Sequence, residues 1–203
     1  MDGLVLEGVP VPGVPAVIRV PVGEPKAAVV PDPDHARLVA DLAAGLADPP
    51  AGTVVRASGA VRLVPAEGGL LPYLTVLGNL VHGCCASRRI TRHAAEEESR
   101  SIARWCGLED LLDRYPHEIT PGRRRLAGVA RALGSRPAAI VLEDAAGLPT
   151  WAALLDFRDN AELLSAGLLL ITPDPDRAAG FTVCPGETRQ TGETGQTGEA
   201  GDA

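Results

Sequence analysis

The hydrophobic residues of this chain fall into short runs separated by turn-forming residues. Between residues 4 and 30, valine, isoleucine and leucine occur in runs that prolines and Gly23 interrupt. Because proline is tolerated mainly at strand edges and in turns, this segment predicts a small layer of β-strands. Residues 26–30 form a short apolar strand, and residues 35–46 then place apolar side chains at helical spacing.

The rest of the chain alternates between apolar strands and helical patterns. Residues 53–64 alternate around Gly59, which predicts a hairpin. Helical patterns dominate residues 75–112, with Gly107 as a stop signal. Strands that alternate with helices predict an α/β protein with a parallel core sheet. The later elements are expected to be helices at residues 123–133 and 151–165 and buried strands at residues 139–142 and 166–172.

Composition predicts one folded domain and a tail. The chain has 203 residues, of which 45% are hydrophobic, and this suffices for one sizeable core. Residues 184–203 are rich in glycine, threonine and glutamate and lack the apolar side chains that a core needs, so we expect them to be disordered. The folded domain is expected to span residues 1–183.

Charge and hydropathy exclude some classes of function. With 19 basic and 26 acidic residues, the net charge of -7 gives no general attraction to nucleic acid. No apolar run approaches the roughly 20 residues needed to cross a bilayer, and the N-terminus lacks the order of a signal peptide. We therefore expect a cytoplasmic protein with no transmembrane segment of its own and no nucleic-acid partner.

The cysteines and histidines do not predict a metal site. The four cysteines show neither paired zinc spacing nor a disulfide framework. The adjacent Cys84 and Cys85 have two open interpretations, a soft-metal or oxidant-sensing pair and small apolar filler, and the second is favoured. The remaining candidates are scattered along the chain: Cys106, Cys184, His35, His82, His93 and His117.

Residues 117–144 carry the most specific pattern in the chain. The segment HEITPGRRRLAGVARAL is followed closely by an apolar strand that ends in Glu143 and Asp144. This order resembles the signature helix and Walker B strand of an ABC-transporter ATPase. Residues 70–79 are similar to the stretch after the Q-loop of that family, and residues 104–112 resemble the helix before its signature. The resemblance covers roughly residues 15–180 and depends on the shared order of several weak segments.

The resemblance implies a fold and a domain plan. A P-loop NTPase-like parallel core sheet is expected, with an N-terminal antiparallel β layer and a helical subdomain inserted at about residues 75–122. The positions that would bind nucleotide in the family are nevertheless replaced. The loop at residues 30–38 stands where the P-loop would be, and Pro31 and Pro33 supply no N–H to a phosphate.

The other P-loop positions have also changed. Ala36 replaces the lysine, while Arg37 and Leu38 replace the hydroxyl residues, and Asp32 and Asp34 add negative charge. Arg37 has two open interpretations, a substitute phosphate ligand and a solvated helix start, and the second is favoured. The degenerate P-loop equivalents are Pro33, His35, Ala36, Arg37 and Leu38.

The other motifs of the family are also replaced in this sequence. Ala66 stands at the Q-loop glutamine, Pro173 at the switch histidine and Thr150 at the D-loop aspartate. Neither alanine nor proline offers a side-chain group that could position water or sense a phosphate. The signature equivalents are Thr120, Pro121, Gly122 and Arg123.

Two carboxylates survive at the end of the Walker B strand, in an order reversed from that of the family. Glu143 could touch magnesium and Asp144 could orient water. The favoured alternative is a hydrated acidic pair, or one paired with a nearby arginine, because isolated buried carboxylates are costly. The basic run at residues 123–125 is similarly open between an anion site and the favoured interpretation, which is a solvated face or partners for local acids such as Glu118.

These patterns favour an ABC ATP-binding-subunit-like protein that is a non-catalytic pseudo-ATPase. It would dock on or regulate a membrane permease or a partner ATPase at the inner face of the membrane, with no confident cofactor and no metal. One alternative is a partly functional ATPase, completed in a heterodimer, which would use ATP and Mg. Another is a soluble adaptor without a transporter.

Overall fold

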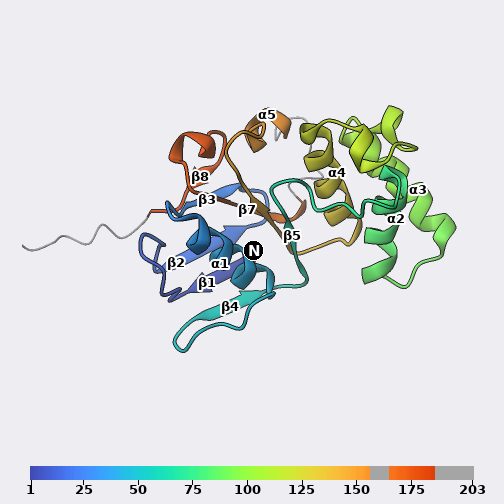
Figure 1. Ribbon diagram of the computed structural model, residues 1–203. Coiled ribbons are helices and arrows are strands. Elements are labelled where there is room, and N and C mark those ends of the chain that lie inside the picture. The colour runs from blue at the N-terminus through green and yellow to red at the C-terminus, as the bar shows by residue number, and fades with distance from the viewer. Residues whose placement is uncertain (156–164, 186–203) are drawn as a thin grey trace, which may run out of the picture.

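The computed structural model describes residues 1–155 and 165–185, and a parallel sheet lies at its centre (Figure 1). The strand order is β5-β6-β7-β3-β8, and each neighbouring pair runs parallel. This sheet confirms the expected α/β class. Its strands are β3 (Lys26–Val29), β5 (Val61–Val64), β6 (Ala139–Glu143), β7 (Gly167–Thr172) and β8 (Thr182–Val183).

A smaller antiparallel sheet forms the expected N-terminal β layer. Its order is β2-β1-β4, with β1 (Asp2–Glu7) between β2 (Val17–Pro21) and β4 (Val54–Ala57). The predicted hairpin at residues 53–64 is therefore wrong, because β4 pairs with β1 while β5 pairs with β6. Alternation identified two strands correctly, but it carries no information about which partner each strand takes.

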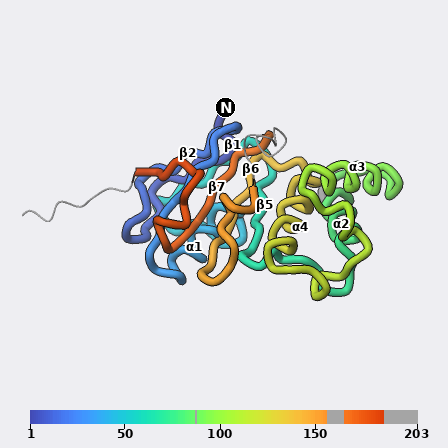
Figure 2. Tube along the Cα trace, turned by 90° about the horizontal axis from the view of Figure 1, so that it is seen from above, coloured from blue at the N-terminus to red at the C-terminus, as the bar shows by residue number. Residues whose placement is uncertain are grey.

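The helices gather mainly at one end of the molecule, where α2, α3 and α4 lie side by side, away from β1 and β2 (Figures 1 and 2). The two helices α2 and α3 fall in the range expected for the helical subdomain. The helices are α1 (Pro33–Ala44), α2 (Val76–Ser87), α3 (Arg92–Trp105), α4 (Pro121–Gly134) and the short α5 (Trp151–Leu154), with 3₁₀ turns η1 (Glu109–Leu111), η2 (Pro116–Glu118) and η4 (Pro175–Ala178).

Some expectations for the C-terminal part of the chain fall on residues that the structure does not describe. The helix expected at residues 151–165 begins as α5, but residues 156–164 lie outside the described ranges. The expected disordered tail lies outside them from residue 186 onward. Within the described residues, no helix is long and apolar enough to span a membrane.

Both faces of the parallel sheet are buried. Along β6, Ile140 and Leu142 pack into one apolar cluster with side chains of α4, and Ala139 and Val141 pack into a second with side chains of α1. Successive side chains of a strand point to opposite faces, so a strand covered on both sides needs an uninterrupted apolar run. This explains the continuous apolar sequences of β6 and β7.

The helices approach closely where α2 crosses α4. A Cβ added at Gly83 would lie 2.3 Å from the carbonyl oxygen of Arg131, which is backbone and cannot move away. A Cβ at Gly78, in the same helix, would meet the Cβ of Leu74 at 3.2 Å. Gly83 therefore sets the spacing between α2 and α4.

The substitution Gly83→Ala should lower the free energy of unfolding by about 1–3 kcal/mol through overpacking, even though alanine favours helices. Gly78→Ala is the matched control and should change the free energy of unfolding by less than about 1 kcal/mol. Urea unfolding of both variants would measure the difference. Equal stability of the two variants would show that α2 and α4 are free to separate.

Candidate functional site

A cavity of about 270 Å³ lies at the carboxyl ends of the central parallel strands. It is bounded by the start of α1, the segment after β5 and the ends of β6 and β7. In open α/β sheets, ligands bind at this edge. The structure thus brings together residues that the sequence assigns to separate motifs: Pro33, Ala36, Arg37, Ala66, Glu143, Asp144, Ile171 and Pro173 line this cavity.

The start of α1 is capped by the chain itself. Asp32 is the N-cap residue, and its Oδ1 accepts a hydrogen bond of 2.8 Å from the backbone N–H of His35. Pro33 has no N–H to offer, and Asp34 adds a second acid to the first turn. These acids stabilise the positive end of the helix dipole, which is the place where an anion would otherwise bind. His35 and Leu38 lie on α1 and are not among the residues that line the cavity.

Asp144 is the most heavily bonded side chain of the site. Its carboxylate accepts hydrogen bonds from Arg177 at 2.8 Å, from Arg125 at 3.1 Å and from Thr172 at 3.0 Å. Burial alone would raise the pKa of this carboxyl, but the bonds from Arg177 and Arg125 hold the pKa below its ordinary value. The side chain is 1% exposed, so it is a buried, charged group with its oxygens already in use.

Arg125, one of the two arginines that bind Asp144, is fully buried. Its guanidinium stacks 4.0 Å above the ring of Trp151, whose Nε1 donates a 2.8 Å hydrogen bond to the carbonyl of Glu143. Burial lowers the pKa of Arg125, and the bond to Asp144 opposes that change. The expectation of a solvated face at residues 123–125 is therefore wrong at Arg125.

The two arginines before it bond to backbone rather than to an acid. Arg123 donates to the carbonyl of Gly107 at 2.8 Å, and Arg124 donates to the carbonyl of Pro116 at 3.3 Å. Glu118, suggested as an acidic partner, instead accepts a 2.6 Å hydrogen bond from the backbone N–H of Tyr115. The basic run thus fastens the start of α4 to the segments before it.

Glu143 pairs across the cavity with Arg37. The Arg37 Nε lies 3.2 Å from Glu143 Oε1 without hydrogen-bond geometry, while Nη1 donates to Oε2 at 3.5 Å. Arg37 also donates to Asp41 at 3.1 Å. Burial raises the pKa of Glu143 and the charge of Arg37 lowers it, with a net rise. Arg37, although 58% exposed, is thus shared between two acids rather than simply solvated.

The signature equivalents lie elsewhere. Thr120, Pro121, Gly122 and Arg123 line a separate cavity of about 500 Å³, together with residues of the segment before α5. Thr120 caps α4 by accepting a 3.4 Å hydrogen bond from the backbone N–H of Arg123, and Thr150 caps α5 in the same way. The structure does not bring these residues into the first cavity.

Sequence reasoning missed three side chains of this site. Arg177 follows the Thr-Pro-Asp turn, Thr172 ends β7, and Trp151 begins α5. Their contacts join positions far apart in the chain, and no spacing rule connects them. The one available signal was the buried acidic pair at residues 143–144, which required some basic partner.

The cysteines fit the filler interpretation better than a paired metal site. Cys84 is buried with its Sγ 3.6 Å from the Ser99 hydroxyl, while Cys85 is exposed. Burial raises the pKa of Cys106 to about 12, which makes it unreactive at neutral pH. Among the described residues, no group of three or more acidic, histidine or cysteine side chains is arranged to hold a metal.

Comparison with known proteins identifies related sequences. No family model matches the chain. It is 29% identical over 182 residues to the Fe(3+) ions import ATP-binding protein FbpC of Yersinia pestis, a match that covers 81% of this chain and 51% of that protein. It is 30% identical over 117 residues to the bacitracin export ATP-binding protein BceA of Halalkalibacterium halodurans, over 56% of this chain and 46% of that protein. The chain thus spans about half the length of these curated relatives.

Solved structures share the architecture. The ADP conformation of MJ1267, an ATP-binding cassette of an ABC transporter, superposes with a TM-score of 0.68 at 17% identity, over 88% of this chain and 84% of that one. A putative metal-chelate type ABC transporter in an inward-facing conformation gives a TM-score of 0.66 at 16% identity, over 89% and 77%. The chain therefore has the fold of an ABC ATP-binding cassette and is similar in sequence to ATP-binding proteins of import and export.

Proposed function

We propose that this chain is a non-catalytic protein similar to the ATP-binding subunits of ABC transporters. It would dock on or regulate a membrane permease or a partner ATPase at the inner face of the membrane. The observation that carries the proposal is the internal bonding of Asp144. A carboxylate that accepts hydrogen bonds from two arginines and is held below its ordinary pKa is a poor general base.

Magnesium and ATP do not fit the residues of the α1 cavity. The prolines and Asp32 leave the start of α1 with few free N–H donors, and the charge of Arg37 is already shared with Asp41 and Glu143. A charge-assisted hydrogen bond is worth about 1.5–3 kcal/mol, so the loss of several weakens binding by orders of magnitude. The volume of about 270 Å³ also lies below the range of about 300–1,000 Å³ usual for ligand pockets.

The segment before α2 supports an interaction role. Asn79 is fully buried and binds the backbone of this segment, accepting from Leu71 N–H at 2.7 Å and donating to the carbonyls of Leu71, Leu74 and Thr75 at 3.0–3.1 Å. These bonds fix a loop that leaves Tyr73 72% exposed. In the family that the chain resembles, the groove beside the Q-loop and the helical subdomain receives the permease, so we infer that this segment forms part of a docking surface.

A partly functional ATPase remains the second candidate. It is favoured by the convergence of Arg37 and Glu143 on one cavity, with Thr120 and its neighbours lining another that a second subunit could complete. The related proteins include an importer and an exporter, so they supply neither a substrate nor a direction. A soluble adaptor without a transporter is the third possibility.

Isothermal titration of the full chain with Mg-ATP tests the proposal directly. Because few donors and, among the described residues, no unshared cation face the α1 cavity, we expect no saturable heat up to millimolar nucleotide. Titration after mixing with a co-purified ATPase separates the second candidate, since a composite site would bind only in the mixture. Micromolar binding by the isolated chain would overturn the non-catalytic proposal.

Asp144→Asn should lower the free energy of unfolding by about 3–5 kcal/mol, because it leaves the buried Arg125 without its counter-charge. Glu143→Gln is the matched control and should cost less, since its partner Arg37 is largely exposed. The folded pKa of Asp144 is depressed, so its contribution is complete above the ordinary pKa of about 4 and is lost as the pH falls below it.

Urea unfolding between pH 3 and pH 7 would measure both effects. Asp144→Asn should flatten the acid side of the stability profile. If the two substitutions proved equally mild, Asp144 would not be the central partner that the structure indicates.

Co-purification from native cells under mild detergent tests the docking proposal. We expect a membrane permease or an ATPase to be recovered with the tagged full chain, and Tyr73→Ala to reduce that recovery. Tyr115→Ala, which removes an exposed aromatic side chain outside the segment before α2, is the matched control. Recovery of neither partner would count against docking and in favour of the adaptor.

A further inference from the structure

A basic cavity of about 440 Å³ lies away from the α1 cavity, where β5, α2 and α4 meet. Arginine or histidine side chains reach it from all three elements, and no aspartate or glutamate is among the described residues that line it. The chain as a whole carries a net charge of -7, so its composition alone does not predict a cavity lined by basic side chains. The lining residues are Arg62, Leu63, His82, Gly83, Ala86, Arg131, Ala132 and Ser135.

Arg131 is the central side chain of this basic cavity. It is partly buried, and burial lowers its pKa. Within residues 1–155 and 165–185, it has no hydrogen bond or ion pair through its side chain. Its Cγ lies 2.8 Å from the place of a Cβ on Gly83, and its Nη2 lies 3.5 Å from that of Gly69, so close packing fixes its position.

The other basic side chains of the cavity are also placed by the fold. Arg62 Nε donates a 3.0 Å hydrogen bond to the Ser135 hydroxyl, which in turn donates to the carbonyl of Ala132 at 2.8 Å. Two guanidinium groups, from a strand and from a helix, are therefore held at one cavity.

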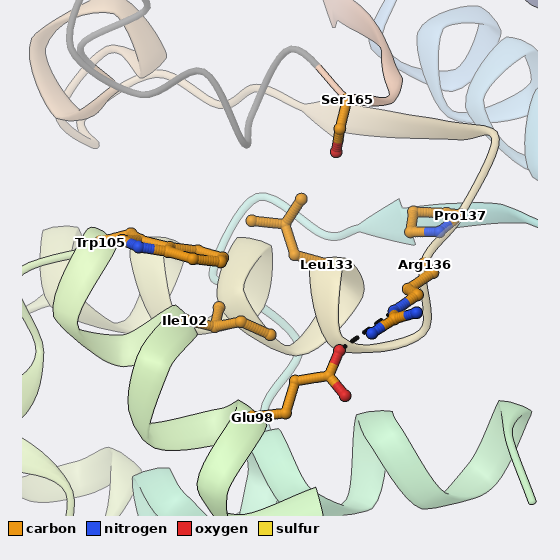
Figure 3. A pocket seen from close by; sticks show the side chains of 7 residues that line it. All are labelled: Glu98, Ile102, Trp105, Leu133, Arg136, Pro137 and Ser165. Carbon is orange, nitrogen blue, oxygen red and sulfur yellow. Dashed lines mark hydrogen bonds and ion pairs between the residues drawn. The ribbon is translucent and has the colours of Figure 1, made fainter.

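Another cavity, of about 450 Å³, lies between α3 and α4, and its arginine differs from Arg131 in having an acidic partner (Figure 3). It also contains an arginine, but Arg136 Nε lies 3.2 Å from Glu98 Oε1, as the dashed line in Figure 3 marks. Glu98 bonds Arg88 as well, at 2.6 Å. The chain supplies a counter-charge at Arg136, as Asp144 does at Arg125. It supplies none to Arg131 among the residues described.

We propose that the basic cavity binds an oxyanion, a phosphate or a carboxylate group of a small molecule, with Arg131 and Arg62 as its principal ligands. Guanidinium groups bind such anions through paired N–H donors, and the anion would supply the counter-charge that Arg131 lacks among the described residues. This site is independent of the proposed function, because it shares no residue with the α1 cavity.

Isothermal titration of the full chain with inorganic phosphate and, separately, with succinate at constant ionic strength tests the site and distinguishes the two sources of the anion. We expect saturable binding of at least one of them and a loss of at least tenfold in affinity for Arg131→Gln. Arg136→Gln, an arginine that has an acidic partner, and Arg37→Gln, in the α1 cavity, are matched controls that should retain binding.

Amide chemical shifts of the wild-type chain provide a second measurement that does not depend on the folding of a variant. Saturation should shift the resonances of Gly83, Ala86 and Ala132. The proposal fails if neither anion binds saturably, if these resonances do not respond, or if folded Arg131→Gln binds as the wild type does. Loss of binding in Arg37→Gln alone would move the anion to the α1 cavity and also contradict it.

Discussion

The bond between Arg125 and Asp144 is the constraint on which the rest of the site depends. It joins the first turns of α4 to the end of β6, and Arg177 extends it to η4, while Trp151 covers the guanidinium. Two charges buried to this extent are tolerated only as a pair. The elements that would surround a nucleotide are thus held together by the protein's own ions.

This internal pairing explains how the architecture can be stable without a nucleotide between its elements. Apolar clusters on both faces of the parallel sheet keep the strand ends in place, and Asp32 keeps α1 in place. Neither stabilising contribution requires a phosphate. The same cavity that brings Glu143 and Arg37 together leaves both already paired. Fold and activity can therefore separate, because different residues determine them.

Much of the fold was predictable because its signals are local. The apolar runs of β6 and β7, the helical periods of α1 and α4 and the breaks at proline and glycine each depend on neighbouring residues. Strand partners were not predictable, so residues 53–64 were assigned to a hairpin although β4 and β5 enter different sheets.

The candidate site also has features that the sequence predicts and features that it does not. Its acidic pair could be recognised at the end of an apolar strand, and the prolines of residues 30–38 led to the prediction that no normal phosphate cradle forms there. The partners of that pair could not be recognised, because Arg125 resembles a surface residue in sequence and Arg177 lies 33 positions beyond Asp144. Tertiary packing, rather than spacing, decides which charge is buried beside which.

The self-capped start of α1 has a consequence for how this protein behaves in a cell. A ligand that binds only the folded state adds stability in proportion to the logarithm of its concentration. A helix whose first turn is completed by Asp32 needs no phosphate to satisfy that turn. On the proposed function, the folded population of this chain, and hence its supply for assembly with a partner, would stay constant as the cell's energy charge rises and falls.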